Sequence, residues 1–118
     1  MNDLDDDSVP PVDAAQLEAA YGELIATAHR VGVRVVGSTL LPYRGAITWT
    51  SAREVERETL NHWIRDGGHF DVSVDLAGVV ADPTDAERLQ ARFDGGDHIH
   101  LNDAGYAAIA QAIPILAL

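Results

Sequence analysis

The chain has no cysteine, and its 118 residues include only 8 lysines and arginines against 19 aspartates and glutamates. Without cysteine the chain can form no disulfide, no thiolate nucleophile and no cysteine-based zinc or iron–sulfur site, although the redox compartment stays open. The formal net charge of −11 argues against nucleic acid and anionic membrane surfaces as partners, because both attract clustered lysine and arginine. The few basic residues are scattered along the chain instead.

Long apolar runs are missing as well. No stretch approaches the roughly 20 residues of a membrane span, and the acidic start lacks the basic end and apolar centre of a signal peptide. A longer precursor could carry such a signal, so the sequence leaves the localisation undetermined. A hydrophobic content of 47% is ordinary for a globular protein, and 118 residues accommodate at most one domain.

Helix and strand signals alternate after an acidic loop over residues 1–12. Capping residues and apolar periodicity predict helices over 13–31, 51–65, 82–91 and 103–113, and strands over 33–41 and 70–76. The apolar stripes predict three buried helix faces, made by Leu17, Tyr21, Leu24, Ile25, Ala28 and Val31, by Val55, Leu60, Trp63 and Ile64, and by Tyr106, Ile109, Ala110 and Ile113.

The segment Val33 to Leu41 is the clearest strand, and it is apolar on both faces. Such a strand belongs inside a parallel sheet with helices on both sides, and the alternating order predicts an α/β layer fold. Only one other strand is obvious, however, and two-stranded sheets are marginally stable. The chain is therefore expected either to form a homo-oligomer through an open sheet edge or to be the C-terminal part of a larger domain. The second account is the simpler one.

One segment near the C-terminus combines an acid, an imidazole and a helix start. Asp97 and His100 lie three residues apart, so in a turn the carboxylate can fold back onto one ring nitrogen of His100. The other nitrogen then faces a hydroxyl nucleophile. Asn102 or Asp103 can cap the helix that follows, which would anchor the turn. We interpret residues 97–106 as the acid-and-base corner of a hydrolase site.

The spacing alone says little, because residues 66–69 repeat it. His69 lies in a glycine-rich gap between a helix and a strand, where an exposed histidine in a turn is the expected outcome. His100 differs because it leads directly into a capped helix.

A nucleophile to match this pair is missing. The four serines are Ser8, Ser38, Ser51 and Ser73, and none follows a strand in the tight glycine-containing turn that exposes a reactive hydroxyl. Ser38 comes nearest, in the second half of the strong strand. The reactive serine is therefore expected outside this chain.

The loop after the strong strand carries Tyr43, Arg44 and Trp49. In open α/β sheets, ligands bind beyond the carboxyl ends of the strands, so these three are candidate substrate-binding residues of a pocket wall. The same pattern is equally consistent with surface aromatic residues that bind no ligand.

Residues 93–106 resemble the last sequence block of the SGNH (GDSL-type) hydrolases, which carries the triad acid and base as Asp-x-x-His. Members often continue with Asn-Asp-Ala-Gly-Tyr, as residues 102–106 do here. Residues 35–43 and 63–65 also look like members of the actinobacterial type. Residues 1–3 match the end of the family's Gly-x-Asn-Asp block. The family's serine and glycine blocks lie upstream of that point, and nothing in this chain replaces them.

The resemblance implies a serine esterase with a three-layer, flavodoxin-like parallel sheet. Residues 1–118 would be only its C-terminal portion, with about two strands and four helices. Asp97 matches the triad acid, His100 the base, and Asn2 the residue that donates into the oxyanion hole. The resemblance implies an acyl ester of a carbohydrate or lipid as substrate, that is, a small-molecule or glycan ester. It implies no metal or organic cofactor, and many members are secreted.

Two other interpretations remain open. The first is an inactive fragment that acts only as a folded or oligomerising module. The second is metal binding, since His98 and His100 in an extended segment would point to one side, near Asp94 and Asp97.

Overall fold

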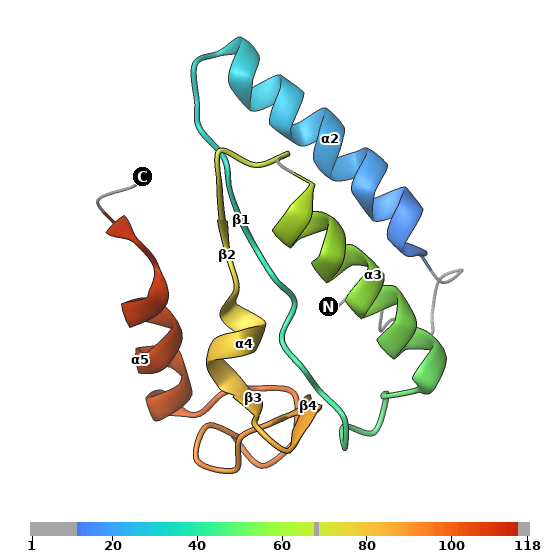
Figure 1. The fold of residues 1–118 in the computed structure, drawn as a ribbon, viewed down its shortest axis with the longest axis vertical. Coiled ribbons are helices and arrows are strands. Elements are labelled where there is room, and N and C mark those ends of the chain that lie inside the picture. Colours follow the sequence, from blue (N-terminus) through green and yellow to red (C-terminus); the bar gives the residue numbers. More distant parts are fainter. Residues whose placement is uncertain (1–11, 68, 116–118) are drawn as a thin grey trace.

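The structure is a computed structural model that describes residues 12–67 and 69–115, a mixed α/β arrangement with four helices and two short sheets. Helices α2 and α3 lie side by side on one side of strands β1 and β2, and α5 lies on the other side (Figure 1). None of the described helices is long and apolar enough to cross a membrane. The elements are α2 (Ala14–Arg30), β1 (Val36–Ser38), α3 (Ser51–Asp66), β2 (Val72–Val74), α4 (Leu76–Val80), β3 (Ala81–Asp82), β4 (Asp85–Leu89) and α5 (Asp103–Ala112).

The two central strands pair in parallel, as the alternating pattern predicts, with Val36 opposite Val72 and Ser38 opposite Val74. Burial on both faces of β1 is not observed in the described part of the chain. Val36 is 40% exposed and Val33 is 54% exposed, whereas Gly37 and Thr39 are buried. Among the described residues, β1 pairs only with β2, so its other edge is open.

The strand predicted over 33–41 covers only Val36–Ser38, and beyond its C-terminal end side chains of α3 bind the backbone of Leu40. The backbone N–H of Leu40 donates to Asn61 Oδ1 at 2.6 Å, and Asn61 Nδ2 donates back to the Leu40 carbonyl at 2.9 Å. Arg57 Nη1 donates to the same carbonyl at 2.9 Å. Because these groups are already satisfied, Leu40 takes no part in the sheet ladder.

The helix starts follow the predicted capping chemistry closely. Asp13 and Gln16 form the predicted capping box at the start of α2, with Asp13 Oδ1 accepting from the Gln16 N–H at 2.8 Å. Asn102 caps α5 by accepting from the Gly105 N–H at 3.0 Å. The cap of α3 is Thr50 rather than Ser51, because the Thr50 hydroxyl accepts from the Arg53 N–H.

The helix predicted over 82–91 is wrong, since this segment is the antiparallel hairpin β3–β4. The Asp82 carboxylate accepts from the Thr84 N–H at 2.8 Å and from the Thr84 hydroxyl at 2.6 Å, which closes a tight turn around Pro83. Burial then alternates along β4 up to Leu89, which is buried. The short helix comes earlier, as α4, with Asp75 as its cap.

Two apolar clusters hold the described residues together, and several predicted stripe residues lie outside both. Leu24, Val31, Val55 and Tyr106 are 54%, 74%, 63% and 53% exposed, against the prediction. One cluster packs α2 against α3 through Ala14, Leu60 and Ile64, with Leu17, Tyr21, Leu40, Trp63 and Phe70 against it. The other consists of Val80, Leu89, Phe93 and Leu101, with Leu41, Val79, Ala108 and Ile109 packed against it.

Candidate active site

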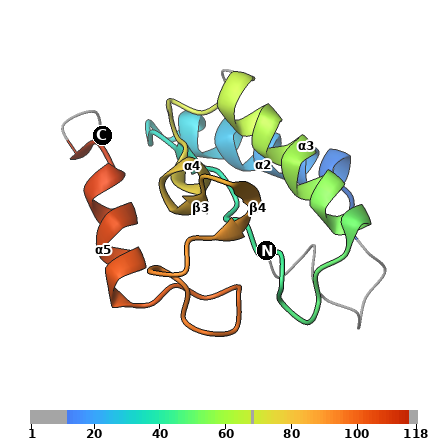
Figure 2. The ribbon, with the colours of Figure 1, turned by 60° about the horizontal axis from the view of Figure 1, so that its bottom comes forward.

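The loop between β4 and α5, residues 93–102, is closed at its base by its own hydrogen bonds. Phe93 and Leu101 are 8% and 6% exposed and belong to the second apolar cluster, so both ends of the loop are anchored. The Gly95 N–H donates to the His100 carbonyl at 2.8 Å, and the Asn102 N–H donates to the Phe93 carbonyl at 2.9 Å. Figure 2 shows this connection projecting beyond α4 and the hairpin, ahead of α5.

Asn102 ties the loop to the helix behind it. While its side-chain oxygen caps α5, its Nδ2 donates to the carbonyls of Arg92 and Asp94, at 3.0 and 3.2 Å. One amide therefore fixes the entrance of the loop, its exit and the first turn of the helix. Sequence reasoning recognised only its capping role.

Within this loop, Asp97 and His100 meet as their spacing predicts. Asp97 Oδ2 lies 2.6 Å from His100 Nδ1, and Asp97 Oδ1 accepts from the backbone N–H groups of Ile99 and His100 at 3.1 and 2.8 Å. The side-chain hydrogen bond from His100, followed by the two backbone bonds, holds the pKa of Asp97 well below its usual range. An ionised carboxylate only accepts hydrogen bonds, so Nδ1 carries a hydrogen, and in the neutral ring Nε2 is then the acceptor. The His100 side chain is 72% exposed.

A second acid–imidazole pair lies beside the first. Asp94 Oδ2 is 2.6 Å from His98 Nδ1, and Asp94 Oδ1 accepts from the Gly96 and His98 N–H groups at 2.7 and 3.1 Å. Partial burial raises the pKa of Asp94, but these hydrogen bonds outweigh the burial and leave the pKa lowered. The sequence placed His98 and Asp94 near the site only as members of a metal alternative.

The loop after β1 contacts the candidate site through Gly45. A Cβ added to Gly45 would lie 3.1 Å from His98 Cγ and 3.4 Å from Arg88 Nη1, so the His98 ring covers this glycine. Both loops extend from the carboxyl-terminal side of the parallel strands (Figure 1).

The three candidate pocket-wall residues of that loop differ in accessibility. Tyr43 is 1% exposed, so its ring belongs to the packed interior. Arg44 lies over the ring of Trp49, 5.2 Å from its centroid, and pairs with Glu87 at 3.3 Å. Trp49 Nε1 is buried and has no hydrogen-bond partner among the described residues. Arg44 and Trp49 are both intermediate in exposure, and the Arg44 side chain is 40% exposed.

A sequence profile of the GDSL-like lipase/acylhydrolase family matches residues 1–108. The chain belongs to this family. No curated protein matches it. Membership in a GDSL-like acylhydrolase family supports hydrolysis of ester bonds as the general class of activity.

The serines among the described residues belong to elements other than the 93–102 loop. Ser38 and Ser73 are strand residues of β1 and β2, and Ser51 is the first residue of α3. Within residues 12–67 and 69–115, no serine hydroxyl forms a hydrogen bond with His100. Ser8 and Asn2, the expected oxyanion residue, lie outside the described residues.

The metal-binding interpretation required both histidine rings to point to one side, and the structure does not have this geometry. That interpretation assumed an extended segment, but His98 has a φ of 66°, and each histidine ring binds its own carboxylate. Across the described part of the chain, no group of three or more histidine, cysteine, aspartate or glutamate side chains is arranged to hold a metal ion.

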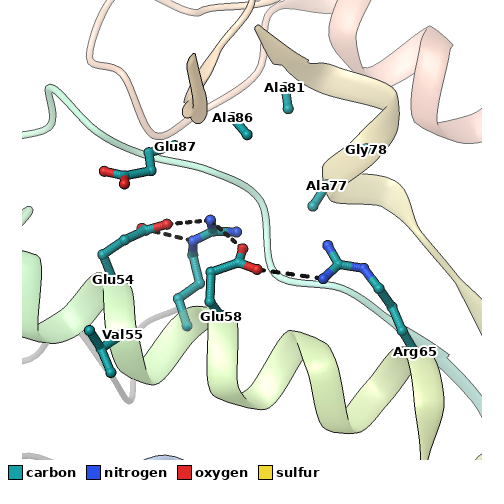
Figure 3. Close-up of a pocket in the computed structure, with 10 residues that line it drawn as sticks. Glu54, Val55, Glu58, Arg65, Ala77, Gly78, Ala81, Ala86 and Glu87 are labelled. Carbon is teal, nitrogen blue, oxygen red and sulfur yellow. Dashed lines mark hydrogen bonds and ion pairs between the residues drawn. The ribbon is translucent and has the colours of Figure 1, made fainter. Parts of the chain in front are cut away.

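A cavity of about 470 Å³ lies apart from the Asp97–His100 pair, between α3, α4 and the hairpin (Figure 3). The arginine and glutamate side chains that α3 contributes to it pair with one another. Arg57 binds Glu54 through two nitrogens and Glu58 at 2.6 Å, and Arg65 bridges Glu58 and Asp75. Arg57 is 1% exposed and also holds the Leu40 carbonyl, so this network positions the loop after β1. Sequence reasoning missed it, because charged residues at helical spacing are usually solvent-facing.

Proposed function

We propose that the chain is the C-terminal portion of a serine ester hydrolase in which Asp97 and His100 are the acid and base. The observation that carries this proposal is the 2.6 Å contact between Asp97 Oδ2 and His100 Nδ1, in a loop anchored at both ends. This contact fixes the ring so that Nε2 is the acceptor, which is the tautomer a general base requires. Asn2 would donate its side-chain amide to the oxyanion.

The reaction would follow the usual course of acyl transfer. A serine from the preceding part of the domain attacks the ester carbonyl, while His100 Nε2 takes its proton and then delivers it to the leaving alcohol. Asp97 stabilises the imidazolium during both transfers. Water then attacks the acyl-enzyme with His100 again as base, which releases the acid. This mechanism uses no metal or organic cofactor.

The arrangement of elements supports a flavodoxin-like, three-layer domain as the parent fold. The strands β1 and β2 are parallel, α2 and α3 lie on one side of them and α5 on the other, and β1 has an open edge among the described residues (Figure 1). A further parallel strand on that edge would bring the serine and glycine blocks to the carboxyl-terminal side of the sheet, where His100 lies.

The substrate class follows from the same proposal. A small-molecule or glycan acyl ester can approach the exposed imidazole of His100 across the loop after β1. Arg44 and Trp49 are the residues of that loop best placed to contact it, whereas Tyr43 would act through packing.

The test compares the 118-residue chain with a protein extended upstream to include the serine and glycine blocks, using a p-nitrophenyl acetate assay. We expect turnover only from the extended protein. His100→Ala should reduce its kcat by roughly 10³-fold or more, because the general base is lost. His62→Ala is the matched control, since His62 also pairs with an aspartate at 2.9 Å but lies 80% exposed on α3.

Two results would count against the proposal. An extended protein without esterase activity would remove the esterase function. Turnover by the 118-residue chain that disappears in His100→Ala would place the nucleophile within these residues, and a fluorophosphonate probe with peptide mass spectrometry would then locate the labelled serine.

A second candidate is a module without activity that associates through its apolar surface. The exposed residues Leu24, Val31, Val33 and Val36 on α2 and near β1 favour this interpretation, because large exposed apolar side chains often mark an interface. Sedimentation analysis of wild type and Val31→Lys separates the two. A dimer that dissociates on substitution supports the module, while a monomer at all concentrations contradicts it.

A further inference from the structure

We propose that Asp94 and His98 act as a clamp that positions His100, by holding the 93–102 loop against Gly45 in the loop after β1. The catalytic meaning of this clamp rests on the proposed esterase function. The clamp itself is a structural property of the described residues, so it can be tested independently of any activity.

Asp94 organises the first half of the loop. Its side chain is 13% exposed, and its two oxygens bind the Gly96 N–H, the His98 N–H and His98 Nδ1. Its backbone carbonyl accepts from Asn102 Nδ2 at 3.2 Å, and its backbone pairs with Leu101 across the loop. A single residue therefore connects the turn that carries His98 with the residues flanking His100.

His98 adopts a backbone conformation that requires support. Its φ of 66° lies in the left-handed region, and it is the one residue other than glycine with a positive φ in the described part of the chain. Left-handed residues other than glycine persist where surrounding contacts hold them, and they cluster at functional sites. Here the contacts come from Asp94 on one side and from Gly45 on the other.

Gly45 supplies the surface against which the clamp closes. Its φ of 113° favours glycine, and an added Cβ would lie 3.1 Å from His98 Cγ, so a larger residue would strain the backbone and push the ring away. The imidazole thereby joins the loop after β1 to the loop that carries the acid and base. These are the two loops that a substrate would contact in the proposed enzyme.

The clamp reaches His100 through a short stretch of backbone. Asp97 and Ile99 flank His98. The Asp97 carboxylate accepts from the Ile99 N–H and also contacts the His100 ring. The Gly95 N–H, next to Asp94, donates to the His100 carbonyl at 2.8 Å. A change in the backbone at residue 98 would therefore alter the geometry between Asp97 and His100.

The first experiment uses the 118-residue chain and needs no activity. Long-range ¹H–¹⁵N correlation spectra of the histidine rings report which nitrogen of His100 carries the hydrogen. In wild type we expect Nδ1–H. His98→Gly keeps the left-handed backbone accessible but removes the ring, and we expect the His100 signals to shift toward a mixture of the two tautomers. His98→Asn tolerates the left-handed conformation and keeps an amide donor, so it should restore the wild-type signature.

The second experiment measures kinetics in the upstream-extended protein. His98→Gly should lower kcat roughly 10- to 100-fold with KM changed less than about threefold, because misplacement of the base affects the transition state most. His98→Asn should recover most of the loss, and His62→Ala should match wild type in both experiments.

The outcomes separate the two proposals. A His100 tautomer unchanged in His98→Gly overturns the clamp, whatever the activity. A shifted tautomer in a protein without esterase activity supports the clamp and removes the proposed function. If His98→Gly abolishes turnover as completely as His100→Ala and His98→Asn does not rescue it, His98 is itself the base and the clamp is overturned.

Discussion

The segments 66–69 and 97–100 share the spacing Asp-x-x-His, yet only the second forms an acid–imidazole pair. Asp66 pairs with His62, one turn back along α3, and His69 stacks on Trp63 with ring centroids 4.1 Å apart. In the second segment, Asp97 binds the ring of His100 and two backbone N–H groups of the same turn. Spacing makes such a pair geometrically accessible, and the surrounding anchors determine whether it forms.

The difference lies in what holds each end. Asp66 ends a helix and keeps an i, i+4 partner on that helix, whereas Asp97 follows a turn already fixed by Asp94. The loop around His100 is also held by two buried residues and by Asn102. A histidine paired with a carboxylate on a constrained loop is suited to proton transfer, and a histidine stacked on a tryptophan ring is not.

The largest expected effect is on kcat of the upstream-extended protein, where substitutions of Asp97 and Asp66 should differ. Asp97→Asn should reduce kcat by roughly 10⁴-fold, because an amide at this position favours the wrong tautomer of His100. Asp66→Asn, the matched control, should leave kcat unchanged. The measurement is steady-state hydrolysis of p-nitrophenyl acetate, and equal effects of the two changes would show that the pair has no special role.

The anchoring of the 93–102 loop should contribute to the free energy of unfolding. Phe93→Ala should lower the free energy of unfolding by about 3 to 5 kcal/mol, because it opens a cavity in the cluster beneath the loop. His69→Ala should lower it by less than about 1 kcal/mol, since only a surface ring stack is lost. Urea unfolding followed by circular dichroism measures both. Similar values for the two variants would mean that the loop is not anchored as described.

Asn102 should contribute more than an ordinary cap. Asn102→Ala removes the cap of α5 and the two bonds to the carbonyls of Arg92 and Asp94, so we expect a loss of about 2 kcal/mol. Asn102→Asp keeps the cap acceptor but lacks the donors, and it should lie between wild type and alanine. If aspartate and alanine destabilise equally, capping is not the main contribution.

The smallest effect should be the pH dependence of the Asp97 network. The pKa of Asp97 is lowered in the folded chain by His100 and the backbone of Ile99 and His100. Its stabilising contribution is therefore complete above the ordinary carboxyl pKa, about 4, and declines as the pH falls below that value. The stability difference between wild type and Asp97→Asn should shrink between pH 6 and pH 2, as measured by urea unfolding across that range. A difference independent of pH would contradict the network.

Local patterns predicted several features of this chain correctly. The capping box of Asp13, the cap of Asn102 and the contact between Asp97 and His100 all involve partners within four residues. Their geometry follows from chain connectivity, so sequence spacing is sufficient. The family resemblance seen in residues 93–106 is likewise confirmed by the match over residues 1–108.

Other features could not be predicted in this way. The strand after α2 stops at Ser38 because Arg57 and Asn61, far along the chain, bind Leu40. Asp82 has the chemistry of a helix cap, yet it closes a hairpin because β4 has a buried partner surface at Leu89. In both cases a contact with residues distant in the chain accompanies the structure that forms.

By itself, then, the sequence determined the starts of α2 and α5, the parallel α/β order, the negative net charge and the pairing of residue 97 with residue 100, because each depends on near neighbours or on composition. Only the tertiary structure decided that Gly45 lies beneath the ring of His98 and which apolar side chains remain exposed. These outcomes depend on how segments distant in the chain pack together, and burial energies that act over such distances leave no periodic signal in the sequence.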